Sequence, residues 1–114
     1  MDVGELVGSF VIEVGVRQAW PFIGFCDNRD ALSKETRLYV DAPWAIDGEA
    51  GGSPADTERW LSAVDSLNGL TVSAAQVEGA GLRLDLADGS YVTASGEAAS
   101  ETVGEPWWFE PWRQ

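Results

Sequence analysis

Residues 67–95 read LNGLTVSAAQVEGAGLRLDLADGSYVTAS, and this stretch specifies the architecture of the chain. From Leu82 to Leu86, leucines alternate with charged residues, the period of two that is typical of a half-buried strand. Asp88-Gly89 predicts a hairpin into a strand at Tyr91–Ser95. With Gly89 in a left-handed conformation Val92 joins the leucine face, whereas a shorter turn would put Tyr91 there instead. A strand at Leu70–Glu78 precedes this hairpin.

The same unit occurs earlier in the chain at a constant offset of 61 positions, as Leu67 lies from Leu6. The matched residues are Leu6, Gly8, Val11, Val14 and Val16 with Leu67, Gly69, Val72, Ala75 and Val77, followed by Ile23, Phe25 and Asp27 with Leu84, Leu86 and Asp88. The first half therefore predicts strands at Ser9–Val16, about Phe22–Cys26 and Arg37–Asp41. A polar insertion, Arg29–Lys34, expands its second turn.

One helix is predicted between the halves, from about residue 54 to residue 67. Ser53 is a good N-cap, Pro54 suits the first helical position, and Asp56 completes a variant of the capping box. Its apolar stripe would consist of Trp60, Leu61, Val64 and Leu67. Asn68-Gly69 supplies the stop.

The expected fold class is α+β. It consists of duplicated antiparallel β-meander units of about six strands, forming an open sheet or a partly closed barrel, with the helix packed on the sheet. Residues 1–114 form a single domain in this prediction, with pseudo-repeat halves at 6–46 and 67–112. The length of 114 residues suits one hydrophobic core.

The charge excludes some classes of partner. Nineteen acidic residues against seven basic ones give a net charge of −12, which repels nucleic acid and anionic membrane surfaces. The acidity serves solubility, or it attracts a basic protein partner. No apolar run approaches the ~20 residues of a membrane span and the N-terminus lacks a basic signal, so a cytoplasmic monomer or homodimer is expected.

No catalytic residue, cofactor or metal is predicted. The chain has no histidine, and Cys26 is expected to be a buried structural thiol. Asp27-Asn28-Arg29-Asp30 resembles the start of a calcium loop, but Leu32 stands where that loop needs glycine. A weak cation site would require the carboxylates of Asp27, Asp30, Asp41 and Asp47 to converge.

Tryptophan is unusually frequent, with six in the chain and three in the segment Glu105–Trp112. This tail either folds back as an edge strand, with Trp107 or Trp108 filling the end of the sheet, or presents an exposed aromatic patch rimmed by acids. In an extended chain Trp107 and Trp108 point to opposite faces, so one would be core and the other contact surface. The predicted partner surface comprises Trp44, Asp27, Asp30, Trp107, Trp108, Trp112, Glu105 and Glu110.

The duplicated L-x-G-x-x-V start, the Leu-x-Leu-x-Leu-Ala-Asp-Gly hairpin and the tryptophan tail resemble an uncharacterised family of small bacterial β-rich proteins. The motifs are structural, so the resemblance supports the fold and transfers no functional residue. In size and acidity the chain is also similar to immunity proteins of bacterial toxin systems.

Three function hypotheses follow. The leading one is a non-catalytic acidic binding protein, an immunity-type inhibitor of a basic protein partner. The second is a small-ligand or carbohydrate-binding module in which Trp20, Trp44 and Trp107 line a groove. The third is an enzyme of unrecognised type that uses carboxylates.

Overall fold

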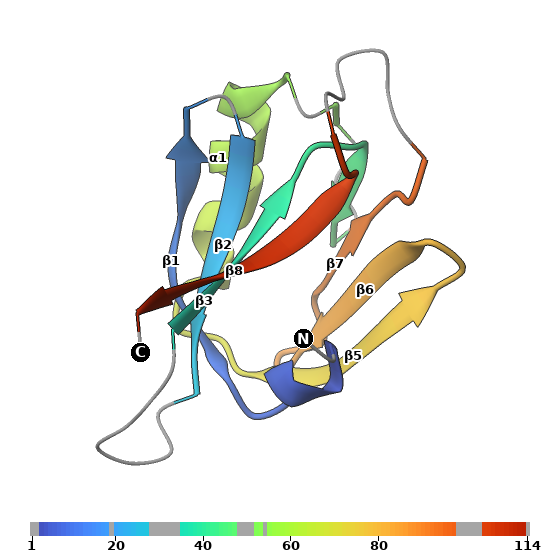
Figure 1. Cartoon of the computed structure of the whole chain (residues 1–114). Coiled ribbons are helices and arrows are strands. Elements are labelled where there is room, and N and C mark those ends of the chain that lie inside the picture. The colour runs from blue at the N-terminus through green and yellow to red at the C-terminus, as the bar shows by residue number, and fades with distance from the viewer. Residues whose placement is uncertain are drawn as a thin grey trace.

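The computed structural model describes residues 3–18, 20–27, 35–47, 52–53, 55–97 and 104–113, with residues 111–113 described by their backbone only. Within this part of the chain, eight strands form two four-stranded antiparallel sheets (Figure 1). The first sheet has the order β1 (Phe10–Arg17), β2 (Trp20–Cys26), β3 (Glu35–Val40) and β8 (Trp107–Arg113). The second has the order β4 (Trp44–Ile46), β7 (Tyr91–Ala94), β6 (Gly81–Leu86) and β5 (Val72–Glu78).

The α+β class is confirmed, but the strand count and the layout differ from the prediction. The short strand β4 and the C-terminal strand β8 raise the number above six, and the strands divide between two sheets that are not closed into a barrel. Of the two alternatives for the tail, the return as an edge strand is observed, because β8 pairs with β3 at the edge of the first sheet.

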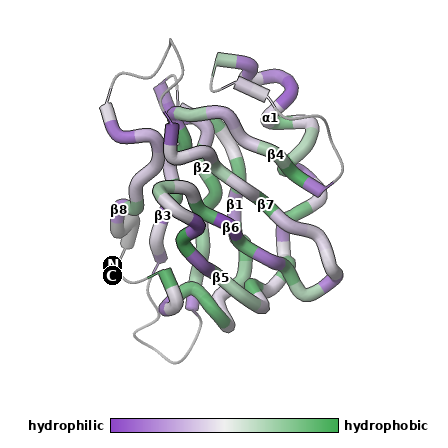
Figure 2. The backbone as a smooth tube through the Cα atoms, turned by 90° about the vertical axis from the view of Figure 1, so that its right-hand side faces the viewer, coloured by the Kyte–Doolittle hydropathy of each residue, from purple (hydrophilic) through white to green (hydrophobic). Residues whose placement is uncertain are grey.

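In the described part of the chain, a hydrophobic core lies between the two sheets and the helix. Buried and partly exposed residues alternate along β6, where Leu82, Leu84 and Leu86 face inward. Figure 2 shows the same alternation of hydropathy along the tube. The other buried members include Leu6, Val11, Ile23, Phe25, Leu38, Val40, Trp44, Ile46, Trp60, Val64, Leu67, Val72, Val92 and Ala94. Each sheet therefore turns one face inward and leaves the other outside.

The helix α1 (Thr57–Val64) begins later than predicted. Asp56 is its N-cap, since the Asp56 carboxylate accepts a hydrogen bond of 3.3 Å from the amide of Arg59. The hydroxyl of Ser53 accepts a local bond of 3.2 Å from the amide of Ala55, ahead of the helix, and Pro54 lies outside the described residues. The last predicted turn is the 3-10 helix η2 (Asp65–Leu67).

The apolar stripe of α1 is narrower than predicted. Trp60, Val64 and Leu67 are buried, whereas Leu61 is 44% exposed. Trp60 donates its indole N–H to the carbonyl oxygen of Gly15 at 3.0 Å, so the helix is tied to β1 as well as packed on it.

Residues 61 positions apart meet at a seam between the two halves, which lies at the starts of β1 and β5. Phe10 and Thr71 form an isolated antiparallel bridge. The hydrogen bonds around it come in equivalent pairs: Gly8 N to Val72 O (2.9 Å) with Gly69 N to Val11 O (2.8 Å), and Val11 N to Leu70 O (2.9 Å) with Val72 N to Ser9 O (2.8 Å). Gly8 and Gly69 both have positive φ, +92° and +85°. The seam is thus a local two-fold arrangement.

The hairpin after β6 has the longer of the two turns considered. Gly89 has φ +94°, and β6 pairs with β7 in the register that places Val92 opposite Leu84. Val92 is buried, so the prediction that it joins the leucine face is confirmed.

Candidate binding surface

The outer face of the first sheet carries aromatic side chains although it points away from the core. Ile23, Leu38 and Phe109 belong to or pack on the core, so the alternate positions on the same strands face outward. Register places Phe22 opposite Tyr39, and Tyr39 opposite Trp108. With Trp20 at the start of β2, we name Trp20, Phe22, Tyr39 and Trp108 the outer aromatic row.

The rings of this row contact one another in sequence across three strands. The centroids of Trp20 and Trp108 lie 5.4 Å apart with the planes at 85°, an edge-to-face contact. Tyr39 and Trp108 stack at 5.3 Å and 14°, and Phe22 follows Tyr39 at 5.8 Å. Contacts at these distances stabilise aromatic pairs beyond the burial of area alone, by about 0.5–1.5 kcal/mol. The row is therefore one ordered unit.

Glycines on the neighbouring strands make room for this packing. A Cβ atom at Gly15 would lie 3.1 Å from the ring of Phe22, so the absence of a side chain in β1 lets that ring cover the strand. In the same way the Glu13 side chain covers Gly24, where a Cβ would lie 2.7 Å from Cγ of Glu13. These close approaches bury Phe22 to 6% exposure on the outer face.

Arg37 contacts Tyr39 and Phe22, two members of the outer aromatic row. Its Nε and Nη2 donate to Oε1 of Glu13 at 3.0 and 2.8 Å, and its Nη1 donates to the hydroxyl of Tyr39 at 3.2 Å. The guanidinium carbon lies 4.1 Å from the centroid of the Phe22 ring. Burial acts to lower the pKa of Arg37, but the hydrogen bonds to Tyr39 and Glu13 outweigh it and the pKa is raised. Arg37 therefore stays charged and fixes Tyr39.

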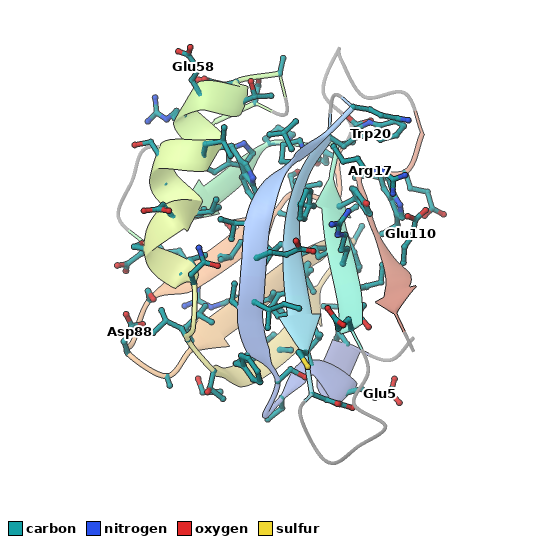
Figure 3. All side chains as sticks on the ribbon, turned by 90° about the vertical axis from the view of Figure 1, so that its left-hand side faces the viewer. Glu5, Arg17, Trp20, Glu58, Asp88 and Glu110 are labelled. Atoms are coloured by element: carbon teal, nitrogen blue, oxygen red, sulfur yellow. The ribbon has the colours of Figure 1, made fainter. Side chains whose placement is uncertain are left out.

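Two clefts flank the contact between Trp20 and Trp108. One, of about 210 Å³, is lined by Arg17, Gln18, Trp20, Tyr39, Trp108 and Glu110. The other, of about 330 Å³, is lined by Trp20, Asp41, Gly104, Glu105 and Trp108. Figure 3 shows Trp20, Arg17 and Glu110 gathered at the same end of the sheet. Gln18 has φ +59°, a left-handed conformation that is uncommon for a residue with a side chain.

The structure brings three of the predicted partner-surface residues together. Trp108, Glu105 and Glu110 lie around Trp20, with Trp108 half-buried and both acids exposed. Trp107 points to the opposite face, where it packs on the core and donates its indole N–H to the carbonyl of Ala80 at 3.0 Å. The prediction that the two tryptophans point to opposite faces is confirmed, while a contact role for Trp108 stays a prediction.

The remaining predicted residues lie elsewhere. Asp27 follows β2 at the end opposite to Trp20. Asp30 lies outside the described residues, and Trp112 is in β8 with its side chain outside the described part. The prediction that Trp44 lies on the partner surface is wrong, because its side chain is buried and only 2% exposed. The Trp44 ring contacts Trp60 edge to face at 5.2 Å, and its indole N–H donates to the carbonyl of Ser53 at 3.1 Å.

The burial of Trp44 follows from strand β4, which the sequence analysis missed. Register places Trp44 opposite Ala94 and Ile46 opposite Val92, so its side chain must share their inward face. The predicted groove of Trp20, Trp44 and Trp107 is consequently not formed, because the three side chains belong to the outer row, the core and the core-facing side of β8. Tyr39, which the analysis did not name, stacks on Trp108 instead.

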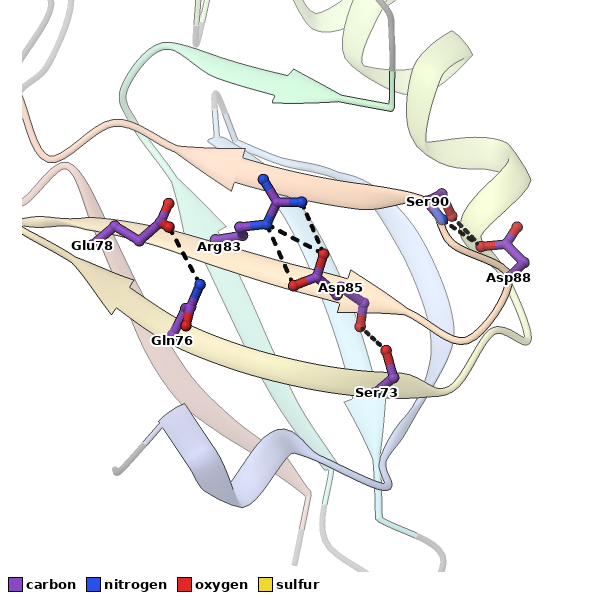
Figure 4. A network of polar contacts seen from close by, with 7 residues as sticks. All are labelled: Ser73, Gln76, Glu78, Arg83, Asp85, Asp88 and Ser90. Carbon is purple, nitrogen blue, oxygen red and sulfur yellow. Dashed lines mark hydrogen bonds and ion pairs between the residues drawn. The ribbon is translucent and has the colours of Figure 1, made fainter.

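The outer face of the second sheet has a different character (Figure 4). Arg83 and Asp85 form an ion pair with 3.0 Å between Nη2 and Oδ1, and Arg83 also lies over the ring of Tyr91 at 4.6 Å. Gln76 donates to Glu78 at 3.3 Å on the neighbouring strand. The polar side chains on this outer face of the second sheet thus pair with one another, as is usual for a surface exposed to solvent.

No protein-family model, curated protein or solved structure matches the chain. Within the described residues, no three potential ligand side chains gather to hold a metal ion. In the same part of the chain, no helix is both long and apolar enough to cross a membrane.

Proposed function

We propose that this chain is a non-catalytic acidic binding protein of the immunity type, which occupies a basic protein partner with the outer face of its first sheet. The observation that carries the proposal is the outer aromatic row, an ordered set of rings on the face away from the core, with Glu105 and Glu110 beside it.

Aromatic side chains on such a face are suited to recognition. Tryptophan and tyrosine are enriched among the residues that dominate binding free energy, and such residues act best when their rings are already held in place. Here Tyr39 is 2% exposed and fixed by Arg37, while Trp20 and Trp108 remain half-buried. The fixed ring of Tyr39 therefore supports the more accessible rings of Trp20 and Trp108.

The charge of the molecule supports a basic partner. A net charge of −12 on 114 residues produces a negative field that accelerates encounter with a cationic surface and opposes contact with an anionic one. Glu105 and Glu110 add local negative charge at the aromatic row itself.

The test is to recover partners at low ionic strength, purify the captured protein and titrate it against this chain by calorimetry. Between about 50 mM and about 500 mM salt, we expect the affinity to fall by at least about tenfold, because screening weakens attraction between surface charges. An affinity that does not change with salt would count against a basic partner.

Two variants that each remove one negative charge test whether the partner binds at the outer aromatic row. Glu110→Gln removes one negative charge beside the aromatic row, and Glu58→Gln removes one from the exposed helix α1. Net charge changes by one in both, so we expect only Glu110→Gln to weaken binding by more than about twofold. Equal effects would mean that overall charge, rather than this face, governs association.

A carbohydrate ligand is the second candidate, favoured by the cleft of about 210 Å³, which sets Gln18, Arg17 and Glu110 beside Trp20. Hydrogen-bonding side chains next to aromatic rings are the usual composition of a sugar site. Tryptophan fluorescence titrated with a sugar panel at high salt separates the two candidates, since only the sugar complex would persist there.

A further inference from the structure

We infer that the cleft between Trp20, Trp108 and Glu105 binds one lysine or arginine side chain of the basic partner. This inference rests on the proposed function and specifies the chemistry that the outer face would recognise. It concerns the cleft of about 330 Å³, which lies on the Glu105 side of the two tryptophans.

The aromatic walls of this cleft form a corner. The planes of Trp20 and Trp108 meet at 85°, so a group placed in the corner contacts two rings of different orientation. Cations are attracted to aromatic faces within about 6 Å, and cages of several rings are the usual way in which proteins bind alkylammonium groups.

The charges around the corner favour a cation. Asp41 and Glu105 line the cleft, and its lining among the described residues contains no lysine or arginine. The neighbouring cleft contains Arg17 together with Glu110, so its formal charges offset, whereas the charged residues that line the Glu105 side are both acidic. A cationic side chain therefore fits the Glu105 side.

The fold fixes the corner in place. The amide of Asp41 donates to the carbonyl of Pro106 at 2.7 Å, which ties the segment carrying Glu105 to the end of β3. Register then sets Trp108 opposite Tyr39, and the stacking of those rings orients the indole. Little ordering is needed on binding, which favours affinity.

The experiment uses N-acetyl-lysine N-methylamide as the probe and records the indole N–H signals of the full chain by NMR. We expect the probe to shift the signals of Trp20 and Trp108 and to leave that of the buried Trp60 unchanged. N-acetyl-norleucine N-methylamide, which lacks the amine, should bind at least about fivefold more weakly, because the attraction of a cation to the rings is lost.

Two variants test the walls separately. Trp20→Leu removes one ring and should weaken the lysine probe about fivefold, and Glu105→Gln, at an exposed position, should weaken it about twofold without affecting the fold. Leu61→Ala, a change at an exposed apolar residue on α1, should leave probe affinity unchanged. Equal affinity for the norleucine compound, or undiminished lysine affinity in both wall variants, would overturn the inference.

The outcomes also separate this inference from the proposed function. If partner binding depends on salt and on Glu110 but is unaffected by Trp20→Leu, the cleft inference fails and the function stands. If the lysine probe binds at the corner while the captured partner shows no salt dependence, the proposed function fails and the cleft remains. A disaccharide that shifts the same indole signals at lower concentration than the lysine probe would refute the cation site.

Discussion

Single residues with tightly constrained surroundings hold the core together. Gly52 is one, because its backbone pairs with Trp44 through bonds of 2.9 and 3.0 Å while the indole ring lies against its Cα. A Cβ atom at Gly52 would lie 2.6 Å from the Trp44 ring. The two backbone bonds and the burial of the ring both oppose the shift that a methyl group would require.

Gly52→Ala is therefore expected to lower the free energy of unfolding by about 1–3 kcal/mol, the usual cost of overpacking a well-packed site. Urea denaturation followed by tryptophan fluorescence measures the change. Gly104→Ala is the control, since nothing lies within 4 Å of the added methyl group there, and its effect should stay within about 0.5 kcal/mol. Similar losses in the two variants would refute this account.

Asp88 makes the stability of the β6–β7 turn depend on pH. Hydrogen bonds from the hydroxyl and the amide of Ser90 hold the pKa of the Asp88 carboxyl group below its ordinary value. The unfolded chain therefore takes up the proton at a higher pH than the folded one. The contribution of Asp88 to stability is complete above the unfolded pKa of about 3.9 and is lost as the pH falls through the lower folded value.

Asp88→Asn should accordingly reduce the loss of stability in this acid window, which denaturation curves between about pH 2 and about pH 6 would measure. Ser90→Ala should also reduce it, because the first of the two bonds is removed. An acid dependence unchanged in both variants would show that Asp88 does not titrate differently in the folded and unfolded states.

At the scale of elements, equivalent positions in the two halves should respond alike. Leu6 ends the 3-10 helix η1 (Val3–Leu6) and Leu67 ends η2, and each is 1% exposed next to the seam. Leu6→Ala and Leu67→Ala are each expected to cost about 2–5 kcal/mol, through lost burial and the cavity left behind. Thermal or urea unfolding gives both values. The expected cost at one position with a cost below about 1 kcal/mol at the other would contradict equal roles.

Much of the element structure could be predicted from local pattern. The leucine alternation at 82–86 placed β6, and the left-handed tendency of Gly89 fixed its hairpin. The alternation of side chains along an extended tail also predicts that Trp107 and Trp108 point to opposite faces of the sheet. The predicted start of α1 was wrong. Ser53 and Asp56 both suit an N-cap, and the local sequence does not decide which of them caps the helix.

The candidate surface was only partly predictable, because it depends on register between distant strands. Trp20 and Trp108 lie far apart in the sequence and meet only because β8 pairs with β3 and β3 with β2. The sequence predicts an exposed Trp44 because β4 is three residues long, too short for a periodic signal. Which aromatic residues meet is thus decided by the pairing and register of the strands, and not by the sequence of any one segment.

At the scale of the whole molecule, the net charge of −12 opposes folding. Like charges lie closer together in the compact state than in the unfolded chain, so self-repulsion destabilises the fold. We expect the free energy of unfolding to rise between about 10 mM and about 300 mM sodium chloride, where screening becomes effective. Urea denaturation at each ionic strength measures it, and a fall in stability with salt would contradict the dominance of repulsion.

The seam between the halves also has a consequence for the order of folding. Its hydrogen bonds join Gly8 with Val72 and Gly69 with Val11, so they form only after a long loop has closed, at a cost in chain entropy. The β1–β2 and β5–β6 hairpins close over a few residues each and need no such loop. We therefore expect the seam, like the long-range pairing of β3 with β8, to form more slowly than either local hairpin.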